Sequence, residues 1–265
     1  MFSYCKKFFG MPLSEQEKGL NYYFLTLINC DCFSISIQPD AYLFQSSGKI
    51  KFTARRNSSS DLEVFNQVWG RKEYAKATTI LKSKMVNNKR ATIIDAGANA
   101  GYTSLFFYQD FPDARIYSIE PDAGNYSMIE KNIALNHASQ ITPLQFGLWD
   151  RSCNLMVDRS YRDGREWSIQ VIETNEESEL KGISVTDLME QHDIDEIDLF
   201  KIDIEGAESR LFKDAGYANR FLSKTKVIAM EIHDENVSRE AVYQLFRENN
   251  FSYFEFNDLT IAYKN

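Results

Sequence analysis

The sequence predicts an α/β fold: a mostly parallel sheet with helices on both faces, closed by a C-terminal antiparallel hairpin and preceded by an N-terminal α+β extension. Three observations predict it. From residue 91 onward, short apolar runs alternate with helical patterns. The first of these runs ends at Asp95 and leads directly into a glycine-containing loop. Residues 1–90 lack this alternation, so we expect two units, an extension at 1–90 and a core domain at 91–265.

Within the extension, residues 41–53 predict a hairpin because two alternating runs flank Ser46, Ser47 and Gly48. The sequence Ser-Asp-Leu-Glu at 60–63 matches a capping box and predicts the start of a helix. One face of this helix is apolar, formed by Leu62, Phe65, Val68 and Trp69. We expect that face to pack against the core; the alternative is a lid over a substrate.

In the core domain, apolar runs predict the strands and intervening amphipathic patterns predict the helices. The expected strands are 91–95, 115–120, 141–148, 197–204 and 226–232. The expected helices are 101–110, 122–136, 186–192, 206–216 and 238–249. Two further runs, 252–256 and 259–263, flank Asn257 and Asp258 and predict the terminal hairpin.

Composition narrows the class of protein. A chain of 265 residues with 43% hydrophobic content suits one large domain or one domain with an extension. The formal net charge of −8 disfavours a broad phosphate-binding face, so we expect no nucleic-acid partner. The apolar stretch at 22–28 is too short to span a membrane, and residues 1–18 lack a signal-peptide core. We therefore expect a soluble, cytoplasmic protein with no membrane partner.

The four cysteines are Cys5, Cys30, Cys32 and Cys153. The C-x-C pair at 30 and 32 has no second pair to complete a zinc site, so we interpret all four as reduced structural thiols.

The loop after Asp95 indicates a cofactor site. Its sequence is G-x-N-x-G from Gly97 to Gly101, whereas a dinucleotide site usually has G-x-G-x-x-G. S-adenosylmethionine fits this loop better, because it has no phosphates and needs a tight turn beside its methionine part. The next expected strand ends at Glu120, where a carboxylate can accept hydrogen bonds from both ribose hydroxyls.

Three motifs together resemble the FkbM family of S-adenosylmethionine-dependent methyltransferases. They are Asp-Ala-Gly-Ala-Asn-Ala-Gly-Tyr at 95–102, Ile-Glu-Pro-Asp at 119–122, and Phe-Lys-Ile-Asp-Ile-Glu-Gly-Ala-Glu at 200–208. The resemblance spans about residues 91–233, and the segment 61–74 is similar to the one that precedes the core in this family. It implies a class I, Rossmann-like, seven-stranded methyltransferase fold and O-methylation of a hydroxyl on a sugar or a secondary metabolite.

The resemblance assigns roles around the cofactor. Gly97, Asn99 and Gly101 should shape the pocket at the methionine part, supported from beneath by Asp95, while Glu120 holds the ribose. The residues expected at the carboxylate are Tyr102 and Thr103, because they open a helix. The residues expected at the adenine are Pro121, Gly147, Leu148 and Asp150.

Methyl transfer to a hydroxyl also needs a general base. His233 is the leading candidate because it follows an apolar strand and titrates near neutrality, although a strand-end histidine is more often structural. Asp203 and Glu205 are the second candidates, and Asp203 equally suits the ammonium group of the cofactor. Lys201 lies within an expected buried strand and therefore needs an acidic partner; Glu205, Glu231 and Asp95 are the options.

The same strand ends raise the question of a divalent metal. The side chains concerned are Asp203, Glu205, Glu231, His233 and Asp234, whose oxygens and imidazole suit Mg²⁺ or a similar ion. The ammonium group of the cofactor explains the acids equally well, so no metal ligand is assigned from the sequence.

The acceptor pocket should involve residues 1–60 and an insertion at 151–182. Tyr161, Trp167 and three arginines, Arg159, Arg162 and Arg165, favour a polar or anionic ring-bearing acceptor, although such arginines more often form a solvated loop. The sequence has no Asn-Pro-Pro-Tyr signature of the kind found in some N-methyltransferases. N-methylation and a non-catalytic module remain the alternatives, and the aromatic N-terminus suits either a homodimer contact or cover for its own core.

Overall fold

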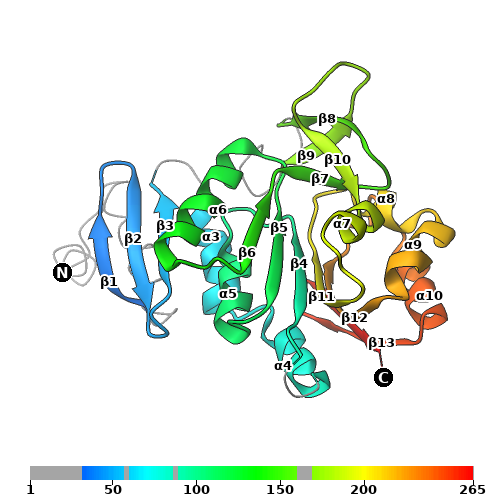
Figure 1. Cartoon of the computed structure of the whole chain (residues 1–265), viewed down its shortest axis with the longest axis horizontal. Coiled ribbons are helices and arrows are strands. Elements are labelled where there is room, and N and C mark those ends of the chain that lie inside the picture. Colours follow the sequence, from blue (N-terminus) through cyan, green and yellow to red (C-terminus); the bar gives the residue numbers. More distant parts are fainter. Residues whose placement is uncertain (1–31, 57–59, 86–88, 160–168, 265) are drawn as a thin grey trace, which may run out of the picture.

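The computed structural model describes residues 32–56, 60–85, 89–159 and 169–264 (Figure 1). Its central element is a seven-stranded sheet in the order β13-β14-β12-β11-β4-β5-β6. The five strands β12, β11, β4, β5 and β6 are parallel to one another, while β14 pairs antiparallel with both β12 and β13. The described part of the chain therefore forms an α/β fold around a mixed sheet.

The elements of this core follow the expected alternation. The strands are β4 (Thr92–Ala96), β5 (Arg115–Ile119), β6 (Ile141–Leu144), β11 (Ile197–Ile202), β12 (Thr225–Glu231), β13 (Phe251–Phe256) and β14 (Leu259–Lys264). The helices are α5 (Tyr102–Asp110), α6 (Ala123–Asn136), α7 (Val185–Gln191), α8 (Glu208–Phe212), α9 (Ala215–Leu222) and α10 (Arg239–Glu248).

Side chains of successive residues in the central strands point to opposite faces of the sheet, as the strand geometry requires. Ile93 and Leu199 lie in one apolar cluster, beneath α4 and α5, whereas Ile94 and Phe200 lie in the other, beneath α7 to α10. Both faces of the sheet are thus covered by helices, which explains why these strands read as continuous apolar runs.

Two elements differ from the sequence prediction. The run 141–148 does not form one strand, because the chain leaves the edge of the main sheet after β6 and continues as β7 (Phe146–Trp149), which pairs with β10 (Lys181–Ser184). The predicted helix 206–216 is two helices, because Asp214 takes an extended conformation and caps α9 by accepting a hydrogen bond from the backbone of Tyr217 at 2.8 Å.

The insertion contributes strands to a second, four-stranded sheet in the order β7-β10-β8-β9. Its other members are β8 (Cys153–Asp158) and β9 (Gln170–Glu173). Tyr161, Arg162, Arg165 and Trp167 lie outside the described residues. This small sheet sits beside the top of the central sheet in Figure 1, so the insertion adds a wall at one end of the parallel strands.

The N-terminal part forms a three-stranded antiparallel sheet of β1 (Cys32–Ile37), β2 (Ala41–Ser46) and β3 (Lys51–Arg55). It is followed by α3 (Asp61–Phe65), the π-helical turn η1 (Asn66–Gly70) and α4 (Ala75–Lys84). The predicted capping box does not form: Ser60 precedes α3, but its side chain makes no capping hydrogen bond to the helix. Cys5 and Cys30 lie outside the described residues, and Cys153 is a free thiol.

Aromatic side chains join this N-terminal part to the core. Phe52 packs edge to face against Phe65 and Trp69, with ring centroids 5.0 and 4.7 Å apart, and Trp69 packs in the same way against Phe106 of α5 at 5.5 Å. The predicted apolar helix face therefore packs against the core. None of the helices in the described residues combines the length and apolar character needed to cross a membrane.

Candidate functional site

A cavity of about 340 Å³ opens at the carboxyl ends of β4, β5, β11 and β12. This is the edge at which parallel α/β sheets bind their ligands, and the volume suits a small molecule. Its lining comes from the loop after β4, from the ends of β5, β11 and β12, from β7 and β9, and from η1 with the residues that follow it. The cavity thus brings together segments from the core, the insertion and the N-terminal part.

The loop after β4 has three residues with positive φ: Gly97 at 77°, Asn99 at 51° and Gly101 at 83°. At Gly97 a Cβ atom would lie 1.7 Å from the carbonyl oxygen of Asp203, so only glycine allows the loop to approach the end of β11. At Gly101 a Cβ would lie 3.3 Å from Cα of Ile129, so this glycine allows α5 and α6 to pack closely. Gly97 and Asn99 line the cavity, whereas Gly101 lies behind it.

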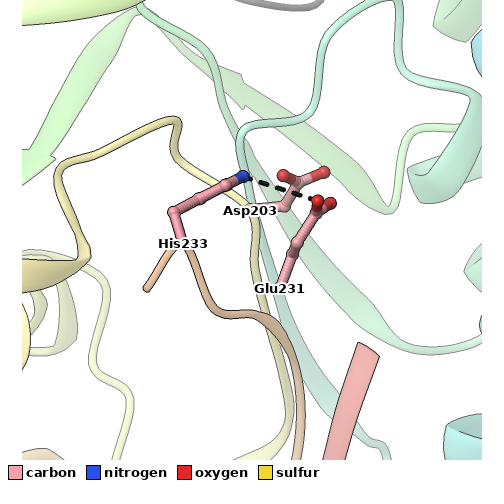
Figure 2. Close-up of side chains that lie close together, drawn as sticks. All are labelled: Asp203, Glu231 and His233. Atoms are coloured by element: carbon pink, nitrogen blue, oxygen red, sulfur yellow. Dashed lines mark ion pairs between the residues drawn. The ribbon is translucent and has the colours of Figure 1, made fainter. Parts of the chain in front are cut away.

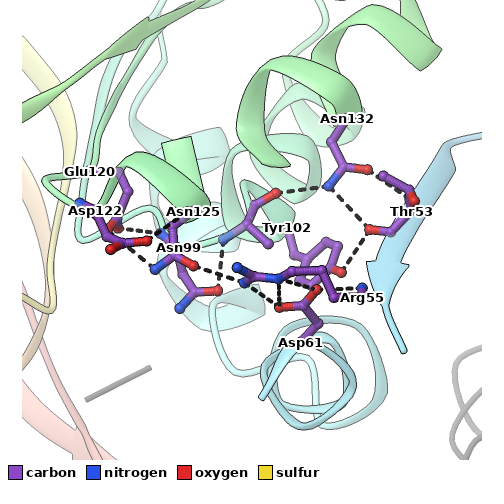
Figure 3. Close-up of polar contacts among 10 residues, drawn as sticks. Thr53, Arg55, Asp61, Asn99, Tyr102, Glu120, Asp122, Asn125 and Asn132 are labelled. Atoms are coloured by element: carbon purple, nitrogen blue, oxygen red, sulfur yellow. Dashed lines mark hydrogen bonds and ion pairs between the residues drawn. The ribbon is translucent and has the colours of Figure 1, made fainter. Parts of the chain in front are cut away.

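Glu120 is only 4% exposed and is held by the neighbouring backbone (Figure 3). Its Oε2 accepts a 2.8 Å hydrogen bond from the backbone N–H of Asn99, and its Oε1 accepts from the N–H of Asp122 at 3.0 Å and from Nδ2 of Asn125 at 3.3 Å. Burial raises the pKa of Glu120 to about 7, although these hydrogen bonds oppose the shift. The carboxyl group therefore changes charge near neutral pH.

The network continues into the N-terminal part (Figure 3). Arg55, at the end of β3, donates a 2.8 Å hydrogen bond to Oδ1 of Asn125 and pairs with the fully buried Asp61 at 2.6 Å. A chain of polar contacts therefore links the N-terminal part to the cavity, running from Asp61 through Arg55 and Asn125 to Glu120. Nothing in the local sequence pattern indicated this link.

Asp95 lies beneath the loop and is fully buried. Its Oδ2 accepts a 2.6 Å hydrogen bond from Ser104, and its Oδ1 is 3.3 Å from Nζ of Lys201. Lys201 also donates to the carbonyl oxygens of Ala96 and Gly97 at 3.1 and 2.6 Å. Asp95 is one of the acidic partners expected for Lys201 from the sequence, and the structure confirms this pair. The lysine ties the end of β11 to the loop after β4.

Lys201 also lies 3.5 Å from Oδ2 of Asp203. Burial lowers the pKa of the lysine, but the nearby charges of Asp203 and Asp95 outweigh burial, so the pKa is raised above its usual value. The ammonium group is therefore charged and paired within the protein.

Tyr102, expected at the cofactor carboxylate because it opens a helix, is not among the residues that line the cavity. Its side chain is fully buried, and its hydroxyl donates a 2.9 Å hydrogen bond to the carbonyl oxygen of Thr53 in β3 (Figure 3). The ring packs edge to face against Phe65. Tyr102 thus anchors the extension, while Thr103, the next residue of the helix, lines the cavity.

One part of the cavity wall is mostly apolar. Pro121, Gly147 and Leu148 all line it, as expected from the sequence, together with Ile119 and Val171. Asp150 is not among the lining residues; it pairs instead with Arg151 at 2.8 Å. The insertion reaches this wall through Val171 of β9.

Another part of the wall is acidic. Asp203, Glu205 and Glu231 line it from the ends of β11 and β12, and Glu73 lines it from the turn between η1 and α4. Burial, followed by the charges of Asp203 and Glu231, raises the pKa of Glu73 to about 7. Sequence reasoning missed Glu73, because the segment 61–74 that contains it precedes the core domain and carries none of the three cofactor-site motifs.

His233 is 5% exposed and is not among the residues that line the cavity. Its Nδ1 lies 2.7 Å from Oε1 of the fully buried Glu208, and its Nε2 lies 3.4 Å from Glu231 and 3.8 Å from Glu205. Burial lowers the pKa of His233, but the contacts with Glu208 and Glu231 outweigh it and raise the pKa to about 11. A protonated imidazole cannot accept a proton, so the structure argues against the expected general-base role.

Asp203, Glu231 and His233 converge at this end of the cavity (Figure 2). One ligand-type atom from each lies within 4.8 Å of the others, and these three form the only such group with metal-binding side chains among the described residues. Asp234, which the sequence placed in the same group, is 59% exposed at its side chain and pairs with Arg239 at 2.9 Å. The structure therefore removes Asp234 from the cluster.

Comparison with known proteins agrees with the motifs. The model of the methyltransferase FkbM domain matches residues 95–253. The chain is 29% identical over 154 residues to methyltransferase sdnD of Sordaria araneosa and 23% identical over 136 residues to methyltransferase 1 of Beauveria bassiana. These matches cover 46% and 44% of this chain and 59% and 55% of the two relatives, so they span little more than half of each relative's length.

Solved structures are similar at a coarser level. Methyltransferase FkbM from Methylobacillus flagellatus matches with 17% identity and a TM-score of 0.47, covering 77% of this chain and 53% of that one. A precorrin-6y C5,15-methyltransferase from Geobacter metallireducens matches with 13% identity and a TM-score of 0.43, covering 81% and 94%.

Proposed function

Because the chain belongs to the FkbM methyltransferase family, we propose that it transfers a methyl group from S-adenosylmethionine to a hydroxyl group of a small molecule. The observation that carries the proposal is one cavity with two chemically different walls. A glycine loop, a buried carboxyl group and an apolar surface line one part, and a cluster of carboxylates lines the other. The first wall fits a nucleoside cofactor, and the second fits a polar acceptor.

The residues of the first wall match the parts of S-adenosylmethionine. Glu120 presents a fixed carboxyl group to the ribose hydroxyls, while Pro121, Leu148 and Val171 offer an apolar surface to the adenine. Thr103, at the start of α5, can donate to the cofactor carboxylate, and Asp203 can accept from the ammonium group. When bound, the cofactor supplies an electrophilic methyl group on its sulfonium.

The acidic wall supports O-methylation. A hydroxyl group must lose its proton as the new bond forms, so the acceptor needs a base nearby. We propose Glu73 for this role, because it lines the cavity and its pKa of about 7 lets it hold and release a proton near neutral pH. Asp203 and Glu205 remain alternatives, since they line the same wall.

The acidic wall also indicates the chemical class of the acceptor. Carboxylates accept hydrogen bonds, so Glu73, Glu205 and Glu231 suit an acceptor with several hydroxyl groups, such as a sugar or a polyhydroxylated secondary metabolite. An anionic acceptor would be repelled by this wall. The strand end that carries Asp203 and Glu205 lacks the Asn-Pro-Pro-Tyr signature, which favours a hydroxyl over an amine.

The experiment has two steps. Calorimetry with S-adenosylmethionine and S-adenosylhomocysteine, with NAD as the control ligand, tests the cofactor site in wild-type protein and in Glu120→Ala. We expect micromolar affinity for both cofactors in the wild type, a large loss in the variant and no binding of NAD. A folded wild-type protein that binds neither cofactor contradicts the proposal and favours a non-catalytic module.

The second step uses S-adenosylmethionine labelled at its methyl group against panels of neutral sugars, polyols, phenols and primary amines. Transfer to a hydroxylated compound supports the proposal. Transfer confined to amines would replace O-methylation by N-methylation.

A further inference from the structure

We propose that Asp203, Glu231 and His233 form a binding site for one divalent cation of the Mn²⁺ type. Two carboxylates and one imidazole make up the donor set (Figure 2). Carboxylates suit Mg²⁺, Ca²⁺ and Mn²⁺, whereas imidazole suits transition metals, so a mixed set favours a cation accepted by both ligand types.

The spacing of the donor atoms suits a single ion. Ligand atoms at about 2.1 Å from one ion lie roughly 3 to 4 Å from each other. Nε2 of His233 lies 3.4 Å from Oε1 of Glu231, and the ligand atoms of all three residues lie within 4.8 Å of one another. Small side-chain movements are enough to close the shell, because Asp203 and Glu231 are both partly exposed at the cavity.

A buried ring nitrogen that makes no hydrogen bond is the second observation. Among the residues that the structure describes, Nε2 of His233 has no hydrogen-bond partner, although the residue is only 5% exposed, and its contacts with Glu231 at 3.4 Å and Glu205 at 3.8 Å are longer ion pairs. Figure 2 shows this nitrogen directed at the carboxyl groups of Asp203 and Glu231. A buried ring nitrogen without a hydrogen bond is costly, and a bound cation would satisfy it.

Glu208 gives the histidine the orientation of a metal ligand. Its carboxylate lies 2.7 Å from Nδ1 of His233 and, being an acceptor, takes the Nδ1–H. The second proton of the charged ring is then on Nε2, which faces the cluster, and a cation that binds there displaces this proton to the solvent. Metal-binding histidines are commonly held in this way by a carboxylate on the other ring nitrogen. Glu208 is fully buried, so the arrangement is fixed by the fold.

Other charged groups face the same point. Glu205 lies 3.8 Å from Nε2 of His233, and Lys201 lies 3.5 Å from Asp203. The negative charges therefore outnumber the positive charge of Lys201 around this end of the cavity. Without a cation, His233 is protonated and lies between carboxylates, and a bound cation takes the place of the proton on Nε2.

A cation at this site would also take part in the proposed methyl transfer, an inference that rests on the proposed function. Asp203 and Glu231 line the cavity, whereas His233 lies behind them, so a bound cation would face the acceptor. A divalent cation on the acceptor oxygen favours loss of the hydroxyl proton. Cation binding itself can be tested without acceptor or cofactor.

The test is a titration of chelator-treated, full-length protein with Mn²⁺, followed by the electron paramagnetic resonance signal of free Mn²⁺ and by calorimetry. We expect one Mn²⁺ per chain. His233→Ala and Glu231→Gln should each weaken binding at least about tenfold, and Glu208→Gln about 10- to 100-fold, since it acts only by orienting the ring. Asp234→Asn is the matched control: it removes a neighbouring carboxylate that pairs with Arg239, and it should leave Mn²⁺ affinity unchanged.

Circular dichroism and S-adenosylmethionine affinity verify that each variant is folded and separate this proposal from the methyltransferase proposal. Lost Mn²⁺ binding in His233→Ala with unchanged cofactor affinity supports the site. Folded wild-type protein that does not bind Mn²⁺, or a His233→Ala variant that binds it as tightly as the wild type, overturns the site and leaves the ion-paired histidine as the explanation.

Discussion

The backbone N–H of Asn99 donates a 2.8 Å hydrogen bond to Oε2 of Glu120, which joins the loop after β4 to the acid at the end of β5. Asn99 has a φ of 51°, and its own side-chain oxygen accepts from the N–H of Ala100 at 2.7 Å. The loop conformation and the position of the carboxyl group are therefore coupled. A change at either residue should alter cofactor binding.

Cofactor affinity should depend on pH through Glu120. Burial raises its pKa to about 7, so the carboxylate form that accepts two ribose hydrogen bonds is lost as the pH falls through 7. We expect affinity for S-adenosylhomocysteine to be about tenfold weaker at pH 6 than at pH 8. Calorimetry at both pH values measures this ratio.

Glu120→Gln is the control for that ratio. It keeps the shape of the side chain but cannot ionise, so its affinity should be lower at pH 8 and should vary less with pH than that of the wild type. The ammonium group of the ligand titrates equally in both proteins. An identical pH dependence in the two proteins would assign the effect to the ligand.

Glu73→Gln should lower turnover without loss of the cofactor site. Glu73 lines the acidic wall, and its removal takes away the proposed base. Once an acceptor is known, we expect kcat to fall by about a hundredfold or more, with S-adenosylmethionine affinity changed less than about threefold. Single-turnover kinetics and calorimetry measure the two quantities.

Glu240→Gln serves as the comparison for Glu73, because Glu240 is a surface carboxylate paired with Arg247. It should retain wild-type turnover. If Glu73→Gln also retains it, the base is one of the other carboxylates, and Asp203 and Glu205 become the next candidates.

Lys201→Met should destabilise the fold. The substitution leaves the buried Asp95 without its cationic partner and removes the donor to the carbonyl oxygens of Ala96 and Gly97. We expect the free energy of unfolding to fall by about 3 kcal/mol. Urea denaturation followed by circular dichroism gives this value.

The double variant Lys201→Met with Asp95→Asn distinguishes the effect of the unpaired charge on stability from the effect of altered packing. It removes both charges, so it should recover part of the stability lost in the single variant. A single variant with wild-type stability would show that the buried pair contributes nothing to the fold.

Asp61→Asn should loosen the attachment of the N-terminal part. Asp61 is fully buried and pairs with Arg55, which also contacts Asn125. Losing the buried charge should lower the free energy of unfolding by about 2 to 3 kcal/mol. Asp110→Asn is the matched control, since its pair with Lys82 is partly exposed, and we expect a loss below about 1 kcal/mol. Equal losses in both variants would contradict the assigned role of Asp61.

The sequence predicted the elements of the core because their signals are local. The run before Asp95, the glycines at 97 and 101 and the acid at 120 each lie within one strand–loop unit, and β4, α5 and β5 lie within one or two residues of the expected positions. The prediction was wrong where strand pairing between distant segments decides the structure. The run 141–148 is divided between two sheets, because Phe146 to Trp149 pair with β10.

Site residues follow the same division. The sequence motifs indicated Glu120 and Asp203, which follow β5 and β11, the two parallel strands that flank β4. They did not reveal Glu73, which reaches the cavity only because η1 and α4 fold back over the sheet. They also did not indicate the side-chain partners of Tyr102 and His233, because Thr53 and Glu208 are distant from them in the sequence.

By itself, then, the sequence determined the alternation of strands and helices, the cofactor-type loop and the family motifs, all of which depend on residues close together along the chain. The tertiary structure decided which carboxylates share one cavity, which lysine and histidine they hold, and how the N-terminal part attaches. Burial and charge act through space, so the pKa values of Glu73, Glu120 and His233 depend on segments far apart in the chain that only folding brings into contact.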